Sequence, residues 1–317
     1  MSVLRRVTAA RTARGAAVAA ATALATMAAV GPASAAGTEL NGSWAPFNRC
    51  PVDNPAMLAA DGIDTTAICI SSSSASGSIK LGSSQVPTGR TDLQAGVITH
   101  ADGTTTVISP PGGALVAAPA TLPGGLLGLM CPNNTPIVSA ICKQLADAKL
   151  NKVVATVESV NTPTDFTLLA GVMEGQPILS LPVRIKLDNP FLGDKCYIGS
   201  AKDPIVLRPQ NRTAPDVSVD AFDPDGTANP DGVLNRIVAV GADQGDSTYA
   251  VPGANGCGLL GALNFAVNLK SALPSASGKN NVVLNSASTH VAMFADPTSV
   301  APNEGAELAR HWHTAVK

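Results

Sequence analysis

The chain has 317 residues, of which 45% are hydrophobic, 14% are charged and 3% are aromatic. Its 21 Lys and Arg residues and 23 Asp and Glu residues give a net charge of −2. This composition excludes disorder throughout the chain, because the apolar content is that of a globular protein and the low charge gives little self-repulsion. The length allows one large domain or two modest ones.

Residues 1–35 are predicted to be a signal peptide. The run 16–31 is uncharged and is followed by Ala33-Ser34-Ala35, the small-x-small pattern of a cleavage site. The basic flank before this run contains Arg5, Arg6, Arg11 and Arg14. Because the run is shorter than the ~20 residues of a bilayer span, we expect a secreted protein with no transmembrane span in its mature chain.

The expected mature chain is acidic. Removing the leader takes four arginines and no acidic residue, which leaves 17 basic and 23 acidic side chains and a net charge of −6. An acidic surface repels phosphate backbones, so we expect no nucleic-acid partner.

Residues 36–130 are predicted to form a region rich in β-strands and turns. The serine tract 71–78 is typical of a surface loop. Short strands are expected at 78–81, 96–99 and 104–108. The last two are separated by a turn that contains Asp102-Gly103, which is a strong hairpin signal.

The segment 103–142 contains no charged side chain. Its prolines and glycines exclude a continuous membrane helix. The segment is expected either to pack into the core or to form an apolar patch that binds a lipid, a cell-wall component or a protein.

Residues 131–317 are predicted to form a C-terminal, β-sandwich-like domain. Two amphipathic helices are expected, at 136–150 and 259–273. Short β-branched runs separated by turn residues predict strands at 153–160, 178–187, 205–207, 217–219, 233–240, 281–284 and 290–294. The alternative to this two-region division is a single intertwined domain.

Oxygen-bearing side chains recur between residues 223 and 232, as they do in calcium loops. The candidate ligands are Asp223, Asp225, Asn229 and Asp231. The EF-hand template fails, because Ala228 and Leu234 occupy the positions of its glycine and its bidentate glutamate. Two consecutive turns explain the same residues, so a weak calcium site is the alternative and no other cofactor is expected.

The sequence Gly256-Cys257-Gly258-Leu259-Leu260-Gly261 matches the glycine pattern of dinucleotide-binding loops. Such a site needs an acidic residue about 20 positions further on, and there is none between Asp246 and Asp296. A structural loop is therefore the expected role.

Six cysteines lie after the leader: Cys50, Cys69, Cys131, Cys142, Cys196 and Cys257. An even number in an exported chain predicts three disulfides. Pairing of nearest neighbours along the chain joins Cys50 to Cys69, Cys131 to Cys142 and Cys196 to Cys257.

Five features of the chain together carry a resemblance to a known group: the Ala-rich leader, Asn48-Arg49-Cys50-Pro51, the motifs 128–132 and 196–200, and the run 273–280. In these features the chain resembles uncharacterised secreted proteins of high-GC actinomycetes. The resemblance implies secretion and a disulfide-bonded, β-rich body, and it supplies no catalytic residue.

The sequence contains no G-x-S-x-G, S-x-x-K or H-E-x-x-H motif. A triad of Ser200, His290 and an aspartate remains open, because triads assemble in any chain order.

We therefore expect a mostly β protein with sandwich-like antiparallel sheets, two short helices and disulfide staples. The expected function is that of a non-enzymatic protein of the cell envelope or extracellular medium that acts by binding or by forming a surface layer. The alternatives are a secreted hydrolase with an unrecognised triad and a carrier of an apolar ligand.

Overall fold

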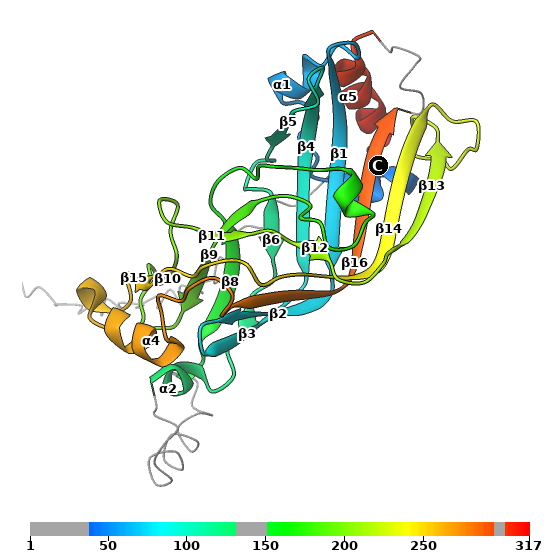
Figure 1. Ribbon diagram of the computed structural model, residues 1–317. Helices are drawn as coiled ribbons and strands as arrows, with labels where there is room; N and C mark the ends of the chain where they lie inside the picture. The colour runs from blue at the N-terminus through cyan, green and yellow to red at the C-terminus, as the bar shows by residue number, and fades with distance from the viewer. Residues whose placement is uncertain (1–37, 131–150, 295–301) are drawn as a thin grey trace, which may run out of the picture. The chain divides into compact units, whose positions relative to one another are not determined.

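The computed structural model describes residues 38–130, 151–294 and 302–317 (Figure 1). The described residues contain one antiparallel sheet of sixteen strands. Its main path runs β12, β14, β16, β1, β4, β6, β8, β9, β10, β15. The mostly β, antiparallel class predicted from the sequence is confirmed, although the strands expected to form two sandwiched sheets share one continuous hydrogen-bonded ladder.

The strands of the first half are β1 (Thr65–Ser74), β2 (Ser76–Leu81), β3 (Ser84–Thr88), β4 (Thr91–His100), β5 (Thr105–Ile108), β6 (Leu115–Ala117) and β7 (Ala120–Thr121). Those of the second half are β8 (Val154–Ser159), β9 (Leu181–Asp188), β10 (Tyr197–Ile198), β11 (Ile205–Leu207), β12 (Gln210–Asn211), β13 (Asp216–Phe222), β14 (Leu234–Asp246), β15 (Ala254–Asn255) and β16 (Asn281–Phe294). The described helices are α1 (Pro55–Leu58), α2 (Gly125–Met130), α4 (Asn264–Ser271) and α5 (Glu304–Thr314), with 3₁₀ turns η1 (Gly42–Phe47), η3 (Leu169–Gly171) and η4 (Leu259–Gly261).

Strand β1 is buried on both faces because its side chains alternate between two cores. Ile68 and Ile70 belong to the larger core, whereas Ala67 and Cys69 belong to the smaller one. This alternation follows from the two-residue period of a strand. Two covered faces explain why the apolar residues Ala67, Ile68, Cys69 and Ile70 are consecutive in β1 rather than alternating with polar ones.

The smaller core is built on aromatic side chains and closed by the C-terminal helix. The rings of Trp44 and Phe222 meet edge to face at 5.4 Å, and Trp44 is fully buried. From α5, Trp312 Nε1 donates to the carbonyl of Phe47 at 2.9 Å. The Cys50–Cys69 disulfide lies in the same core. These contacts fix η1 and α5 against one face of β1 and β16.

Strands from both sides of residue 130 share the sheet. Strand β1 lies between β4 and β16, and β6 pairs with β8. The described residues accordingly fall in one compact unit. The strands on either side of the boundary expected between regions 36–130 and 131–317 thus belong to one sheet, and the division into two regions stays a prediction.

The prediction of a surface loop over the serine tract 71–78 is wrong. Its residues continue β1 and begin β2, and Ser71 and Ser74 are buried. A buried serine is tolerated where its hydroxyl finds a partner, as Ser74 Oγ does on the carbonyls of Ser76 and Asn285. Composition alone gave no indication of these long-range partners.

The helix expected at 259–273 is shorter than predicted. Helix α4 begins only at Asn264, because Gly258, Leu260 and Gly261 all have positive φ values. The described chain also contains α1, α2 and α5, which the prediction of two short helices omits. The helix expected at 136–150 and the signal peptide at 1–35 lie outside the described residues.

Candidate functional site

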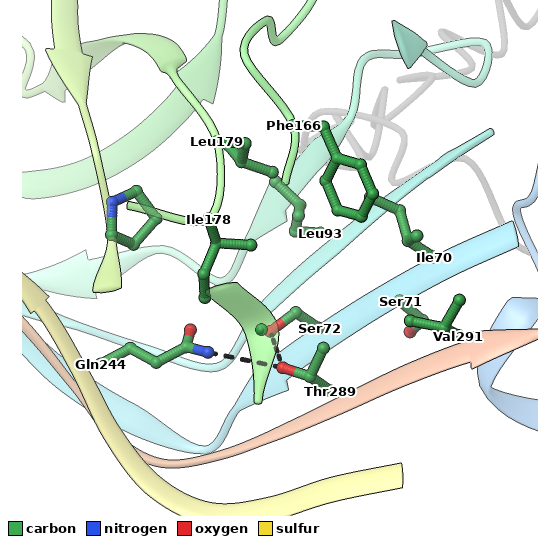
Figure 2. Close-up of a pocket in the computed structure, with 12 residues that line it drawn as sticks. Ile70, Ser71, Ser72, Leu93, Phe166, Ile178, Leu179, Gln244, Thr289 and Val291 are labelled. Carbon is green, nitrogen blue, oxygen red and sulfur yellow. Dashed lines mark hydrogen bonds between the residues drawn. The ribbon is translucent and has the colours of Figure 1, made fainter. Parts of the chain in front are cut away.

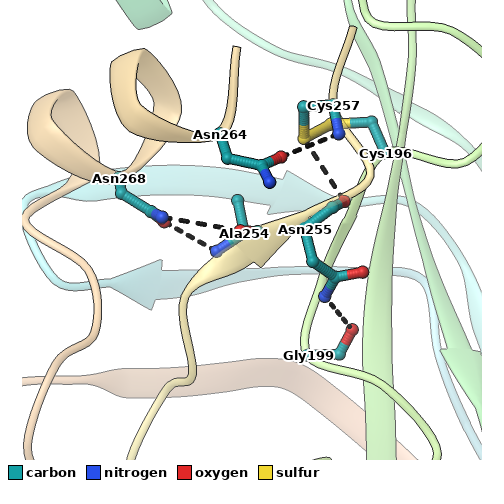
Figure 3. Close-up of a disulfide and its surroundings, with 7 residues drawn as sticks. All are labelled: Cys196, Gly199, Ala254, Asn255, Cys257, Asn264 and Asn268. Atoms are coloured by element: carbon teal, nitrogen blue, oxygen red, sulfur yellow. Dashed lines mark hydrogen bonds between the residues drawn. A yellow bond between two sulfur atoms is a disulfide. The ribbon is translucent and has the colours of Figure 1, made fainter. Parts of the chain in front are cut away.

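A disulfide-bonded turn at residues 256–261 and the helix α4 that follows it form the most unusual surface of the described chain. The Cys196–Cys257 bond joins this turn to the end of the loop before β10. Two asparagines of α4 hold the same turn from the other side (Figure 3). Asn264 Oδ1 accepts from the N–H of Cys257 at 2.8 Å, and Asn268 Oδ1 accepts from the N–H of Ala254 at 2.6 Å.

Glycine is required in this turn because the backbone enters the left-handed region and approaches its neighbours closely. Gly256 has φ +67°, and a side chain there would collide with the carbonyl of Lys195. Leu260 adopts the left-handed conformation without being glycine, at φ 52° and ψ 26°. A leucine in that region is strained by about 1–2 kcal/mol. The turn therefore holds a bulky apolar residue in a costly conformation.

Four apolar side chains on this turn and helix face solvent. Leu259 is 85% exposed, Leu260 100%, Phe265 75% and Leu269 70%. Among the other described large apolar residues, the most exposed are Ile63 at 70%, Leu169 at 65% and Val219 at 62%, and these lie apart from one another in the sequence. We call these four side chains the apolar tip. They lie within eleven consecutive residues, so their exposure is a concentrated feature rather than scattered surface apolarity.

An open groove of about 680 Å³ borders the apolar tip. Leu259 and Leu260 line one side, and Pro190 and Phe191 line the other. Phe191 is itself 55% exposed. The groove thus extends the apolar surface toward the loop before β10.

The turn does not form a phosphate cradle. The N–H of Gly258 donates to the carbonyl of Leu192 at 2.7 Å, and the N–H of Gly261 donates to the carbonyl of Gly258 at 3.2 Å. Amide groups already bonded within the protein are not free for an anion. The geometry agrees with the structural role expected for the glycine pattern.

The described part of the uncharged segment 103–142 buries its apolar side chains, unlike the apolar tip. Val107, Ala114 and Leu122 are buried. Within residues 103–127 no large apolar side chain is exposed. Residues 131–142 lie outside the described residues. The end of the described part, α2, packs beside α4 (Figure 1), so this segment reaches the neighbourhood of the apolar tip.

The expected triad is not brought together. Ser200 lies in the loop after β10, where its hydroxyl accepts from the N–H of Asp203. His290 lies on β16, six strands away along the sheet. Instead, His290 Nε2 contacts Ser288 Oγ at 2.8 Å. These two residues lie on one face of β16 because they are two positions apart.

The Ser288–His290 pair lacks the third group of a triad. His290 Nδ1 is buried and has no hydrogen-bond partner among the described residues. Burial, reinforced by the positive charge of Arg236, lowers the pKa of His290. In the part of the chain that the structure describes, no carboxylate accepts a hydrogen bond from this nitrogen to orient the ring toward Ser288.

The four candidate calcium ligands lie in the turns between β13 and β14. Asp225 Oδ1 accepts from the N–H of Thr227, and Asn229 Oδ1 accepts from the N–H of Asp231. Asn229 Nδ2 donates to Asp223 Oδ1 at 3.0 Å. These bonds are those of turn-forming side chains. The described residues hold no group of three or more His, Cys, Asp or Glu side chains placed to bind a metal.

A small apolar cavity lies in the larger core (Figure 2). Its volume is about 40 Å³, and its walls include Ile70, Leu93, Phe166, Ile178 and Val291. The polar groups at its edge are paired, with Ser72 Oγ 2.9 Å from Thr289 Oγ1. A cavity that binds even benzene measures roughly 150 Å³. This cavity is too small for the apolar ligand of a carrier.

The cysteines follow the predicted order where they are described. Cys50 is bonded to Cys69 and Cys196 to Cys257. Cys131 and Cys142 lie outside the described residues.

No helix in the described ranges combines the length and apolarity that a bilayer span needs.

Comparison of the chain with protein-family models, with curated proteins and with solved structures finds no significant match.

Proposed function

We propose that the protein is a secreted, non-enzymatic protein of the cell envelope or extracellular medium that binds an apolar partner through the apolar tip. The observation that carries this proposal is the exposure of Leu259, Leu260, Phe265 and Leu269 on a turn anchored by a disulfide. Contiguous apolar surface of this kind typically marks an interaction site. A partner that covers these side chains removes their area from water, which is favourable by about 25 cal/mol per Å².

The anchoring supports a role in binding rather than accidental exposure. The Cys196–Cys257 bond, Asn264 and Asn268 together fix the turn and the start of α4. A site that is held rigid before binding loses less conformational entropy when its partner arrives. The strained Leu260 fits the same interpretation, because strained backbone persists where the surrounding structure enforces it.

Site-specific photo-crosslinking tests this proposal. A benzophenone amino acid is placed at Leu260, and a control is placed at Ile63, which is 70% exposed and lies between α1 and β1. Both variants are produced in the cell that naturally exports the protein. We expect an adduct at position 260 and none at position 63, whether the captured molecule is a lipid or a protein. No adduct at 260, or equal adducts at both positions, would overturn the proposal.

A hydrolase is the alternative function, and the 2.8 Å contact between Ser288 and His290 is the observation in its favour. A fluorophosphonate probe labels serine nucleophiles that a base activates. Labelling of Ser288 that disappears in the His290→Ala variant would favour the hydrolase. We expect no labelling, because His290 Nδ1 has no carboxylate partner in residues 38–130, 151–294 and 302–317.

A further inference from the structure

We infer that the partner of the apolar tip is a lipid surface, into which Leu259, Leu260, Phe265 and Leu269 insert. This inference rests on the proposed function and names its partner. Its first support is the shape of the tip. Leu260 is 100% and Leu259 85% exposed, so the two side chains project from the protein with almost no contact to their sides. A projecting tip needs a partner that surrounds it, and a fluid bilayer does so without a preformed pocket.

Several backbone amides that flank Leu259 and Leu260 are already paired within the protein. In hydrocarbon each unpaired N–H or C=O costs several kcal/mol, so inserted backbone must satisfy its own polar groups. The N–H of Ala262 donates to the carbonyl of Leu259 at 3.1 Å, and that of Leu263 donates to the carbonyl of Cys257 at 3.0 Å. Together with the bonds of Cys257, Gly258 and Gly261 described above, these contacts pair five amides of the turn internally.

Two uncharged parts of the sequence meet at this end of the protein. No charged residue occurs from Ser247 to Leu269, a run that contains the whole tip. Helix α2, from the uncharged segment 103–142, packs beside α4 (Figure 1). Charged side chains are the most costly groups to place in a membrane, by about 2.5–3.5 kcal/mol each at its centre. Their absence from residues 247–269 removes that cost for the tip itself.

The charges at the border of the tip are few and of both signs. Asp194 and Lys195 line the groove, and Lys270 follows the last tip residue. A lipid surface bound mainly by electrostatic attraction requires a cluster of basic residues. We therefore infer that binding is driven by apolar insertion, that uncharged headgroups suffice and that salt has little effect.

Co-sedimentation with lipid vesicles tests this inference on the mature protein. One set of vesicles consists of phosphatidylcholine alone, and a second contains equal parts of phosphatidylcholine and phosphatidylglycerol. We expect binding to both sets, and little change when salt is added. Binding only to the anionic vesicles, with loss in high salt, would overturn insertion as the driving force.

Two variants separate insertion from folding. Leu260→Asn removes the projecting side chain at a position whose left-handed backbone asparagine tolerates, so the fold is retained. We expect it to weaken vesicle binding about tenfold or more, since a buried leucine contributes about 1.5–3 kcal/mol. The matched control is Val219→Asn, which changes a 62% exposed side chain on β13 and should leave binding unchanged. Equal effects of the two variants would contradict the inference.

Sedimentation velocity and the crosslinking experiment distinguish the other occupants. A dimer that dissociates on the Leu260→Asn change would assign the tip to a second copy and overturn the lipid inference. A protein adduct at position 260 without vesicle binding would overturn the lipid inference while leaving the proposed function intact. Failure of both vesicle binding and crosslinking would refute both proposals.

Discussion

Asn264, the first residue of α4, accepts a hydrogen bond through Oδ1 from the backbone N–H of Cys257 at 2.8 Å. This bond links the start of the helix to the disulfide that anchors the turn. It closes a short loop whose outermost residue is Leu260. The position of the apolar tip therefore depends on Asn264, which is not one of the four exposed side chains of the tip.

The Asn264→Ala variant should loosen the turn without unfolding the protein. Losing one hydrogen bond to a partly buried amide costs about 1 kcal/mol. We expect the amide of Cys257 to exchange its hydrogen about fivefold faster. The control is Asn268→Ala, which removes the bond to Ala254 and should leave the Cys257 amide unaffected. Unchanged exchange in Asn264→Ala would show that the disulfide alone holds the turn.

Replacing Leu260 by asparagine should not lower stability. The side chain is 100% exposed and makes no packing contribution, whereas its left-handed backbone is unfavourable for leucine. We expect the free energy of unfolding to rise by about 0.5–1 kcal/mol. Leu259→Asn, at a neighbouring residue without positive φ, should leave it unchanged. Thermal unfolding measures both variants, and a destabilised Leu260→Asn would refute the assigned strain.

Glu304 makes stability depend on pH. Its side chain is buried at the start of α5, and this burial raises the pKa of its carboxyl to about 7. The ionised form is disfavoured in the folded state. The protonated carboxyl of Glu304 therefore contributes fully to the free energy of unfolding below about pH 4.5, and this contribution is lost as pH rises through about 7.

The Glu304→Gln variant should remove this dependence. Between pH 4.5 and 8 the free energy of unfolding of the natural protein should fall by about 2–3 kcal/mol relative to the variant. Burial lowers the pKa of His311, so this residue also makes stability depend on pH. Its contribution is the same in the natural protein and in the variant, and it cancels when their free energies of unfolding are subtracted. Glu307→Gln, at the exposed carboxylate paired with Arg310, is the control and should not reproduce the effect. A difference that does not vary with pH would contradict the assignment.

The two described disulfides should have separable effects. Replacing Cys50 and Cys69 by alanine should lower the free energy of unfolding by about 2–4 kcal/mol, because this bond crosses the smaller core. Replacing Cys196 and Cys257 should also reduce stability, but it should in addition weaken binding at the tip. Vesicle binding normalised to folded protein checks this difference. Equal loss of binding in the two variants would contradict the anchoring role of the Cys196–Cys257 bond.

The β-strands were the most predictable part of the fold. The β-branched runs at 153–160, 205–207 and 233–240 correspond to β8, β11 and β14, because local propensity and burial agree there. The serine tract was not predictable, since Ser71 and Ser74 are buried by neighbours far along the chain. The helix α5 was also missed, and its place in the smaller core depends on a long-range contact of Trp312 with Phe47.

The candidate site was predictable only in part. Cysteine spacing along the chain was sufficient to pair Cys196 with Cys257, and the glycine pattern was sufficient to indicate a loop. The location of the exposed apolar surface was not predictable from the sequence. The sequence directed attention to the uncharged segment 103–142, but Val107 and Leu122 are buried whereas Leu259 and Leu260 are exposed. Exposure depends on which elements cover a residue, and tertiary packing decides that.

Tryptophan fluorescence offers the most direct test of the apolar tip as a lipid-inserting surface. The natural residues Trp44 and Trp312 are buried, so their emission stays constant when vesicles are added. A Leu260→Trp variant reports the surroundings of the tip, and an Ile63→Trp variant serves as the control. We predict that phosphatidylcholine vesicles shift the emission of the residue-260 variant to shorter wavelength and leave that of the residue-63 variant unchanged. Unshifted emission at 260 in protein that co-sediments with the vesicles would contradict the account.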